Sequence, residues 1–304
     1  MILIVGGTGT LGRELAPRLL ARGRSVRTLA RHSATPANGE RPGEVEARIG
    51  DVRDAATCAS ALEGVDTVVS AMTGFAGRDA LGSRTIDRDA NLQLIEAARR
   101  AGVRHVIGLS VHQAGPDHPI QLVRDKWAAE EALRRSGLDW TIVRPTAYLE
   151  TWLGIVGGPL VQTGSTRIFG SGRNPINFVS ASDVGQVVEL AIVDPGLRGA
   201  TVEVPGPQDL TLDQLADTVE SVLGRRGRRQ HLSPTMMRIA SLVTRVVNPV
   251  LSAQIATAMV MDTRDMTVDG EALRARFRSI PMTTAADVAQ RMFASTLNAE
   301  ATAT

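Results

Sequence analysis

The chain opens with the stretch that decides its fold, MILIVGGTGTLGRELAPRLLARG, residues 1–23. A short apolar run ends in a glycine-rich turn, and apolar residues at helical spacing follow up to a further glycine. This order predicts a strand, a tight turn and a helix. Glycines let the backbone approach a pyrophosphate closely, and the helix N-terminus offers free N–H groups to it. The turn therefore predicts a dinucleotide site, whose cofactor-binding residues are Gly6, Thr8, Gly9, Thr10, Leu11 and Gly12.

The alternation of strand and helix continues through the first half of the chain. Strand patterns occur at 25–31, 45–51, 66–72, 103–111 and 139–145, helical patterns at 55–64, 89–102 and 120–136, and a polar loop rich in Pro and Gly at 34–44. Strands and helices at this spacing predict βαβ units and a doubly wound parallel sheet. The predicted fold class is α/β of the Rossmann type, with residues 1–150 as the NAD(P)-binding core.

The pattern weakens beyond residue 150. The sequence predicts two strands and a helix capped near Ser182 or Asp183 within 165–196, a late strand at 200–206, a helix at 211–224, and apolar helices at 234–260 that break at Pro249. Residues 151–304 are therefore expected to complete the sheet and to form a smaller, mostly helical substrate lobe within one compact unit.

The charge and cysteine content narrow the kinds of partner. Lys and Arg number 34 against 32 Asp and Glu, and the basic residues are spread along the chain. Nucleic acid is therefore not expected as a partner, and the basic cluster at 224–231 is interpreted as a solvated loop. Cys58 is the only cysteine, which excludes a disulfide framework and a cysteine–histidine metal site, so no metal is expected.

Apolar patterning bears on the compartment. No apolar run reaches membrane-spanning length, and the opening residues do not form a signal peptide. We expect a cytoplasmic protein with a small-molecule substrate and no membrane partner. The apolar helices at 234–260 either pack within the lobe or join two copies in a homodimer.

The ends of the next strands indicate which dinucleotide is bound. An NAD site usually has Asp or Glu after the second strand, where the carboxylate accepts from the ribose hydroxyls, but this chain has Arg31. A cation suits a 2′-phosphate, so NADPH (or NADP+) is predicted over NADH. Asp51 and Val52 after the third strand, the latter against the adenine, and Ser70 and Ala71 after the fourth are predicted as further cofactor contacts.

One residue stands out by its composition alone. Lys126 is the only lysine among the 34 basic residues, and it lies in the helix predicted at 120–136. A bias so strong toward arginine makes the single exception a candidate functional residue. An ammonium is a compact charge with three donors, which arginine does not reproduce.

These motifs together resemble the extended and atypical short-chain dehydrogenase/reductase superfamily, and most closely its NmrA-like group, which includes isoflavone-reductase-type enzymes and NADPH-dependent quinone reductases. The stretches that carry the resemblance lie within residues 1–205 and are GGTGTLGR, GDVRD, DRDANLQLIEAARRAGVRHVIGLS, SGLDWTIVRPT and NFVSASDVG. The resemblance implies a Rossmann fold with a small C-terminal lobe. It also implies that Lys126 binds the cofactor at the nicotinamide ribose and lowers the pKa of a neighbouring acid.

The chain departs from the superfamily at the catalytic tyrosine. That residue stands four positions before the lysine, where this chain has Leu122, and Tyr148 is the only tyrosine. Because hydride transfer leaves negative charge on oxygen, another group must stabilise or protonate it. The catalytic candidates are Lys126 itself, Ser110 at the end of the fifth strand, His112 in the following loop, and Tyr148 after the sixth strand.

Two functions follow from these residues. The first is an NADPH-dependent reductase of a small electrophile, a quinone, enone or aromatic ketone, since a quinone needs the least acid assistance. The alternative is a non-catalytic NADP-binding, redox-sensing regulator of the NmrA type. A sugar-nucleotide epimerase or dehydratase is disfavoured, because that chemistry relies on the tyrosine–lysine pair that Leu122 interrupts.

Overall fold

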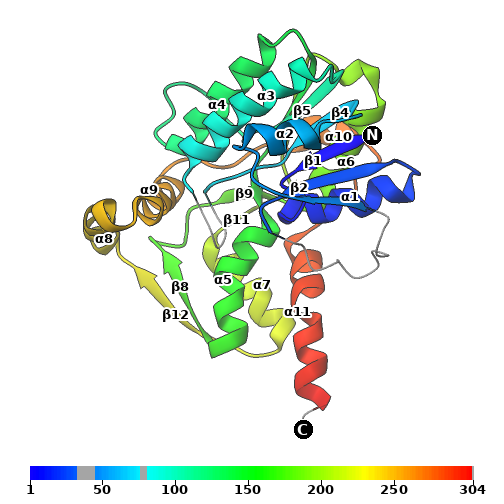
Figure 1. The fold of residues 1–304 in the computed structure, drawn as a ribbon. Coiled ribbons are helices and arrows are strands. Elements are labelled where there is room, and N and C mark those ends of the chain that lie inside the picture. Colours follow the sequence, from blue (N-terminus) through cyan, green and yellow to red (C-terminus); the bar gives the residue numbers. More distant parts are fainter. Residues whose placement is uncertain (33–44, 76–80, 303–304) are drawn as a thin grey trace. The chain divides into compact units, whose positions relative to one another are not determined.

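The computed structural model describes residues 1–32, 45–75 and 81–302, so the loop predicted at 34–44 lies outside the described residues. The chain forms two compact units (Figure 1). The first consists of Met1–Pro145 and Val184–Glu203, and the second of Thr146–Asp183 and Val204–Thr304. The chain therefore passes from the first unit to the second and back before it ends in the second.

A parallel sheet forms the centre of the first unit. Neighbouring strands pair in parallel from β3 through to β6, with Ile4 of β1 opposite Thr28 on one side and Val69 on the other. In the described residues the sheet has seven strands, in the order β10 (Ala200–Val204), β6 (Asp139–Pro145), β5 (His105–Leu109), β4 (Thr67–Ser70), β1 (Ile2–Val5), β2 (Val26–Ala30) and β3 (Val45–Ile49). The order reverses between β1 and β4, and such a switch point is where open α/β sheets bind ligands, at the carboxyl ends of the strands. The predicted Rossmann fold is confirmed.

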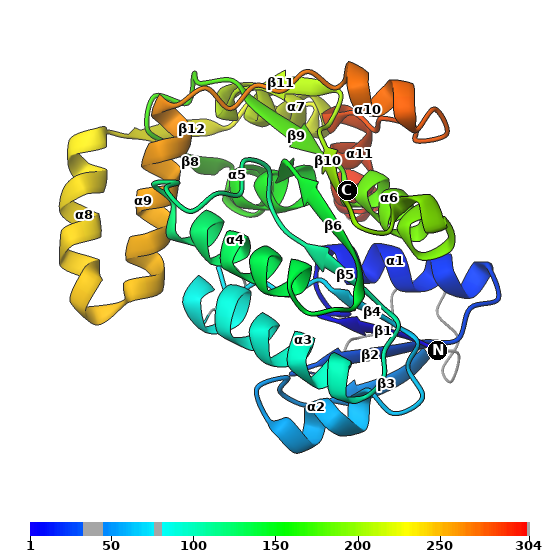
Figure 2. The ribbon, with the colours of Figure 1, turned by 90° about the horizontal axis from the view of Figure 1, so that it is seen from above.

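Helices cover both faces of this sheet (Figure 2). Alternate strand residues such as Leu3 and Val5 pack with Leu94 in a core beneath one group of helices. On the opposite face an ion pair of 2.6 Å joins Arg22 to Glu189. The first group is α2 (Ala55–Ala61), α3 (Asn91–Arg100) and α4 (Gln121–Arg134), and the second is α1 (Thr10–Ala21) and α6 (Ala181–Val193).

Two helix starts can be compared with the sequence prediction. A π-helix, η1 (Arg84–Ala90), precedes α3, so helical structure begins earlier than the predicted residue 89. Helix α6 begins at Ala181, and its cap is the hydroxyl of Ser180, which accepts from the N–H of Ser182 at 3.2 Å. The helix thus begins close to the predicted cap near Ser182 or Asp183, and the capping side chain is the neighbouring Ser180.

The second unit is mostly helical, as predicted. Leu153 and Val156 of one helix pack with Val219 of a second and Phe293 of a third in its core. These helices are α5 (Leu149–Thr163), α7 (Leu212–Leu223) and α11 (Ala285–Thr302). The other elements are strands β7 (Ala147–Tyr148), β8 (Ser165–Phe169), β9 (Ile176–Val179), β11 (Gln208–Leu210) and β12 (Arg228–Leu232), and helices η2 (Pro195–Leu197, in the first unit), α8 (Pro234–Val247), α9 (Pro249–Thr263) and α10 (Glu271–Arg276).

The basic cluster at 224–231 is not wholly a loop. Strand β12 pairs in parallel with β8, and Arg229 within it binds Glu220 at 2.7 Å and Asp217 at 2.6 Å. The predicted helix break at Pro249 is confirmed, since α8 ends at Val247 and α9 begins at Pro249.

Candidate functional site

The glycine turn lies at the carboxyl end of β1. Gly6 has a φ of 89°, and a Cβ there would lie 2.7 Å from the carbonyl oxygen of Ala71. A Cβ on Gly12 would lie 2.5 Å from the Cα of Gly7. Gly9 differs, because its backbone is extended, it is exposed, and a Cβ would meet only the Gly6 oxygen at 3.2 Å. Gly6 and Gly12 are therefore required by the fold itself, whereas Gly9 keeps the outer surface of the turn bare.

The N-terminus of α1 suits an anion. Among the described residues, no side chain caps this helix and no acidic residue lies in its first turn. Thr8 is half-buried and Thr10 is exposed, while the Leu11 side chain is buried in the core. The predicted contact at Leu11 can thus come only from its backbone. Uncapped N–H groups at the positive end of a helix dipole are the arrangement that binds phosphate.

Three predicted residues lie after β2 and β3. Arg53 donates two hydrogen bonds to the carboxylate of Asp51, from Nη2 at 2.6 Å and from Nε at 3.0 Å. These bonds, with a smaller electrostatic effect of Arg31, hold the pKa of Asp51 below its ordinary value. Arg31 is therefore near Asp51, as a shared binding site requires. Val52 is buried and packs in the core of the first unit.

Ser70 and Ala71 end β4 beside the turn. The Ser70 hydroxyl donates to Oδ1 of Asn91 at 2.6 Å, and Nδ2 of Asn91 donates to the carbonyl oxygen of Asp87 at 3.1 Å. The N–H of Ala71 donates to the Val5 oxygen at 2.9 Å. Ser70 thus supports the site through Asn91, and Ala71 brings its backbone against Gly6.

Lys126 connects the ends of two strands to a buried acid. Its ammonium donates to the carbonyl oxygens of Met72 at 2.8 Å and Leu109 at 2.9 Å, and lies 3.0 Å from Oδ1 of Asp87. Two of the three donors of the ammonium are thus used in hydrogen bonds to carbonyl oxygens, and the contact with Asp87 is an ion pair. The side chain is 7% exposed. In this arrangement Lys126 fixes the carboxyl ends of β4 and β5.

Asp87 is a site residue that the sequence analysis missed. It lies on the π-helix η1, is fully buried, and also accepts from the N–H of Gly74 at 2.9 Å. Burial raises its pKa, which the ammonium of Lys126 and the Gly74 N–H oppose. π-Helical turns often occur at functional sites. Asp87 is one of 32 acidic residues, so composition gave no signal of the kind that Lys126 gave.

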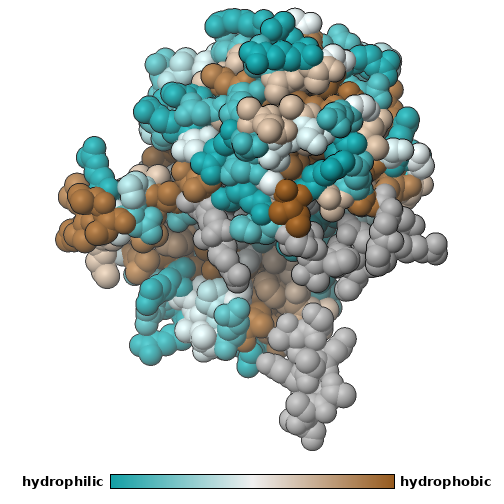
Figure 3. Space-filling model, in the orientation of Figure 1, coloured by the Kyte–Doolittle hydropathy of each residue, from teal (hydrophilic) through white to brown (hydrophobic). Residues whose placement is uncertain are grey.

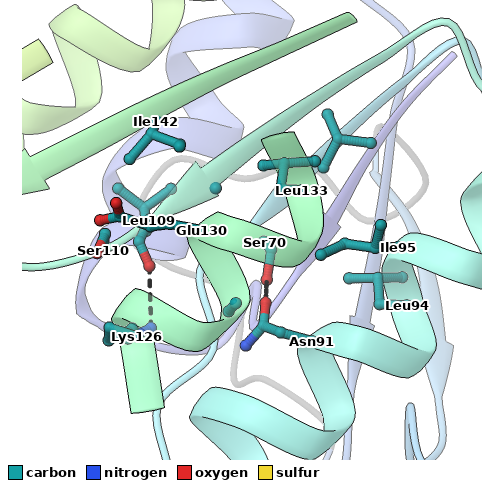
Figure 4. Close-up of a pocket in the computed structure, with 13 residues that line it drawn as sticks. Ser70, Asn91, Leu94, Ile95, Leu109, Ser110, Lys126, Glu130, Leu133 and Ile142 are labelled. Carbon is teal, nitrogen blue, oxygen red and sulfur yellow. Dashed lines mark hydrogen bonds between the residues drawn. The ribbon is translucent and has the colours of Figure 1, made fainter. Parts of the chain in front are cut away.

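Ser110 shares a small internal cavity with Lys126 (Figure 4). The cavity measures about 20 Å³, enough for one water molecule. Lys126 and Ser110 lie on one side of its lining, and the bonded pair of Ser70 and Asn91 on the other. The buried hydroxyl of Ser110 has no hydrogen-bond partner among the described residues. It therefore has an unused donor beside the one lysine of the chain.

The other two catalytic candidates are placed differently. Nδ1 of His112 lies 2.8 Å from the Glu203 carboxylate, which also binds Arg144 at 3.1 Å. Tyr148 belongs to the second unit, and burial together with the charge of Glu150 raises the pKa of its hydroxyl. A raised pKa makes a phenol a weaker acid. The structure thus brings Lys126 and Ser110 together, places His112 against the Glu203 carboxylate, and places Tyr148 in the other unit.

The comparison with protein families decides what the turn and strand ends belong to. Residues 6–195 match the family described as NAD(P)H-binding. The chain belongs to this NAD(P)H-binding family. The match covers the glycine turn, every strand from β2 to β9 and Lys126, so the prediction of a nicotinamide dinucleotide cofactor is confirmed at this level.

Known proteins agree with this membership. This NAD(P)H-binding chain is 32% identical over 259 residues to a (4-alkanoyl-5-oxo-2,5-dihydrofuran-3-yl)methyl phosphate reductase of Streptomyces griseus, covering 85% of this chain and 86% of that protein. It is 24% identical to the chloroplastic protein High chlorophyll fluorescence phenotype 244 of Arabidopsis thaliana, over 80% of this chain but only 61% of that protein's length. An NADPH-dependent quinone oxidoreductase of Escherichia coli, solved with NADPH, superposes with a TM-score of 0.73 at 23% identity, covering 96% of this chain and 100% of that one. The NAD(P)H-binding part of the predicted resemblance is confirmed by the family match, and the predicted fold agrees with this structural likeness.

Two further findings concern the described residues alone. They contain no helix that is both long and apolar enough to pass through a lipid bilayer. Within them, no group of three or more His, Cys, Asp or Glu side chains is arranged to hold a metal ion.

Proposed function

We propose that this chain is an NADPH-dependent reductase that transfers hydride to a small electrophile, with a quinone as the first substrate class to test. The observation that carries the proposal lies at one carboxyl edge of the sheet. There an uncapped glycine turn occurs together with Lys126 and with a Ser110 hydroxyl that has no partner among the described residues. The relatives named above include a reductase and a quinone oxidoreductase, which supports this reaction class.

NADPH is proposed over NADH because of the charges after β2 and β3. Arg53 occupies both oxygens of the Asp51 carboxylate, which leaves that group less able to accept from a ribose hydroxyl. Arg31 lies close enough to lower the pKa of Asp51 and is the predicted contact of a 2′-phosphate. The quinone oxidoreductase of similar fold was solved with NADPH, in agreement with this choice.

The residues of the chain have separate parts in the proposed reaction. The bound cofactor supplies the hydride. Gly9 and the first N–H groups of α1 hold the pyrophosphate, and Lys126 keeps the ends of β4 and β5 in place. The Ser110 hydroxyl donates to the oxygen on which negative charge develops. A quinone suits such a site, because its reduced oxygen is delocalised and needs no strong acid in place of the superfamily's tyrosine.

One observation favours the alternative, a non-catalytic NADP-binding regulator. The ammonium of Lys126 donates to two carbonyl oxygens and forms an ion pair with Asp87, so it has a structural task without any substrate. Leu122 occupies the tyrosine position. A regulator would bind NADPH and never oxidise it.

The test begins with calorimetric titrations of the protein with NADPH, NADP+, NADH and NAD+. We expect NADPH to bind at least about tenfold more tightly than NADH, a difference of about 1.4 kcal/mol. NADPH oxidation is then followed with a panel of quinones and enones. Binding without oxidation of NADPH by any acceptor establishes the regulator, and absence of binding refutes both proposals.

A matched pair of variants assigns the role of Ser110. Ser110→Ala and Thr166→Val each remove a buried hydroxyl that has no partner among the described residues. Their effects on folding should be similar and small, since no hydrogen bond is lost. Only Ser110→Ala should lower kcat, by about a hundred- to a thousandfold for one oxyanion donor, with NADPH affinity unchanged. Equal kcat values for the two variants would exclude Ser110 from the reaction.

A further inference from the structure

Helix α8 (Pro234–Val247) carries a row of exposed apolar side chains. Leu242 is 69% exposed and Val246 is 88% exposed. They share an arc of the helix with four more exposed apolar residues, Met236, Ile239, Val243 and Val247. Figure 3 shows the corresponding brown surface at the position that α8 has in Figure 1. Contiguous apolar surface of this kind marks an interaction site.

The opposite side of α8 is fully used for packing within the second unit. Met237 is buried, and the hydroxyls of Ser241 and Ser252 lie 3.1 Å apart across the contact with α9 (Pro249–Thr263). Ser252 also donates to the Ser241 carbonyl oxygen at 2.9 Å. Helix α9 thus holds α8 in a fixed orientation, and the apolar arc is the side of α8 turned away from α9.

The charges around the arc have one sign. Arg238 and Arg245 are exposed and stand seven residues apart, two helical turns, along one border of the arc. No ion pair or hydrogen bond of either guanidinium is found in the described part of the chain. The sequence has no Asp or Glu from residue 221 to residue 261, a stretch that contains six arginines. The apolar arc is therefore bordered by positive charge, and α8 and α9 carry no acidic residue before Asp262 near the end of α9.

We propose that α8 docks on the surface of an anionic phospholipid bilayer. A helix with apolar side chains on one arc and arginines at its border lies in the bilayer interface, with the apolar residues among the acyl chains and the guanidiniums at the phosphates. Two copies of this chain fit the arc less well, because apposed α8 helices would bring four arginines together without a carboxylate. Such peripheral docking goes beyond the proposed reductase activity, and it departs from the expectation of no membrane partner, which rested on spanning segments.

The experiment uses the full chain and sedimentation with vesicles. Vesicles that contain phosphatidylglycerol are compared with vesicles of phosphatidylcholine alone. We expect binding to the anionic vesicles that weakens as salt is added, and little binding to the neutral ones. The double variant Leu242→Gln/Val246→Gln should lower the partition coefficient by about tenfold or more, since two apolar side chains leave the interface. Arg238→Gln and Arg245→Gln should each lower it about fivefold for anionic vesicles only.

Matched controls separate docking from general stickiness. Ile49→Gln and Val193→Gln change exposed apolar residues on β3 and α6, and both should bind vesicles like the unmodified protein. Unchanged affinity for NADPH shows that the α8 variant is folded. The proposal is overturned if the unmodified protein does not bind anionic vesicles, or if the α8 variant binds them as strongly as the control variants do. A different outcome would assign the arc to a second copy of the chain and would also overturn the proposal. In that outcome, sedimentation velocity shows that the unmodified protein is a dimer and the α8 variant is not, and neither protein binds vesicles.

Discussion

Lys126 and Asp87 form a buried pair whose members depend on one another. The ammonium and the Asp87 carboxylate lie 3.0 Å apart, with the side chains 7% and 0% exposed. Removing one partner of a buried pair leaves the other charge without compensation, which costs about 3–5 kcal/mol. We expect Asp87→Asn and Lys126→Met each to lower the free energy of unfolding by roughly this amount. The double variant should lose about 1–3 kcal/mol less than the sum, because no lone charge remains.

Urea denaturation of the four proteins measures this cycle. Additive losses would show that the pair does not interact and that Asp87 has no part in holding Lys126. The two residues also show what sequence can reveal at this scale. Lys126 was found because it is a single lysine against a background of arginine, whereas Asp87 becomes visible only when η1 turns it toward Lys126 and Gly74.

In the glycine turn, a substitution can lower NADPH affinity without lowering the stability of the fold. Gly9→Ala fits the extended backbone and meets only one atom at 3.2 Å, so the free energy of unfolding should change by less than about 1 kcal/mol. A methyl group on the outer surface of the turn should nevertheless lower NADPH affinity about tenfold or more, since it stands where the pyrophosphate must approach. Calorimetric titration measures the affinity, and urea denaturation the stability.

Two other glycines serve as controls for that variant. Gly23 has a φ of 69°, and a Cβ added there would meet no atom within 4 Å. Gly23→Ala should therefore lower the free energy of unfolding by about 1 kcal/mol and leave NADPH affinity unchanged. Gly6→Ala should be much less stable than either, because its Cβ would collide with the Ala71 backbone at 2.7 Å. If Gly9→Ala binds NADPH as tightly as the unmodified protein does, the pyrophosphate does not bind at this part of the turn.

Helices and strands could be predicted where apolar residues recur at the spacing typical of one type of secondary structure. The strands of the first unit are short apolar runs between polar turns, and each was found near its observed bounds. Helix α5 (Leu149–Thr163) was missed because it is apolar on almost every side and contains three glycines and Pro159, which weaken both the periodic signal and helix propensity. Strand β12 was missed because its sequence, RRQHL, is charged, and only pairing with β8 makes it a strand.

For the whole molecule, one buried histidine should contribute sensitivity to acid between pH 6.5 and about 4. Positive and negative residues nearly balance, 34 against 32, so overall repulsion is small near neutral pH. His105 is buried, and Nε2 lies 3.0 Å from the Thr141 hydroxyl, which itself donates to the Leu197 oxygen. The ring must therefore donate from Nε2, which leaves Nδ1 buried without a partner among the described residues. Burial, aided by Arg198, lowers the pKa of His105 from 6.5 to about 4.

The sign of the pH effect follows from that lowered pKa. Between pH 6.5 and about 4, His105 is protonated in the unfolded chain but neutral in the folded chain. The contribution of His105 to the free energy of unfolding therefore falls as the pH falls through this window, and it is constant above pH 6.5. The loss approaches about 3 kcal/mol. Asp87 has a raised pKa and acts with the opposite sign, which is why the measurement is a difference: urea denaturation of the unmodified protein and of His105→Leu across this pH range. The stability of the unmodified protein relative to the variant should decline from pH 6.5 to 4, and parallel curves would mean that His105 is protonated in the fold at no energetic cost.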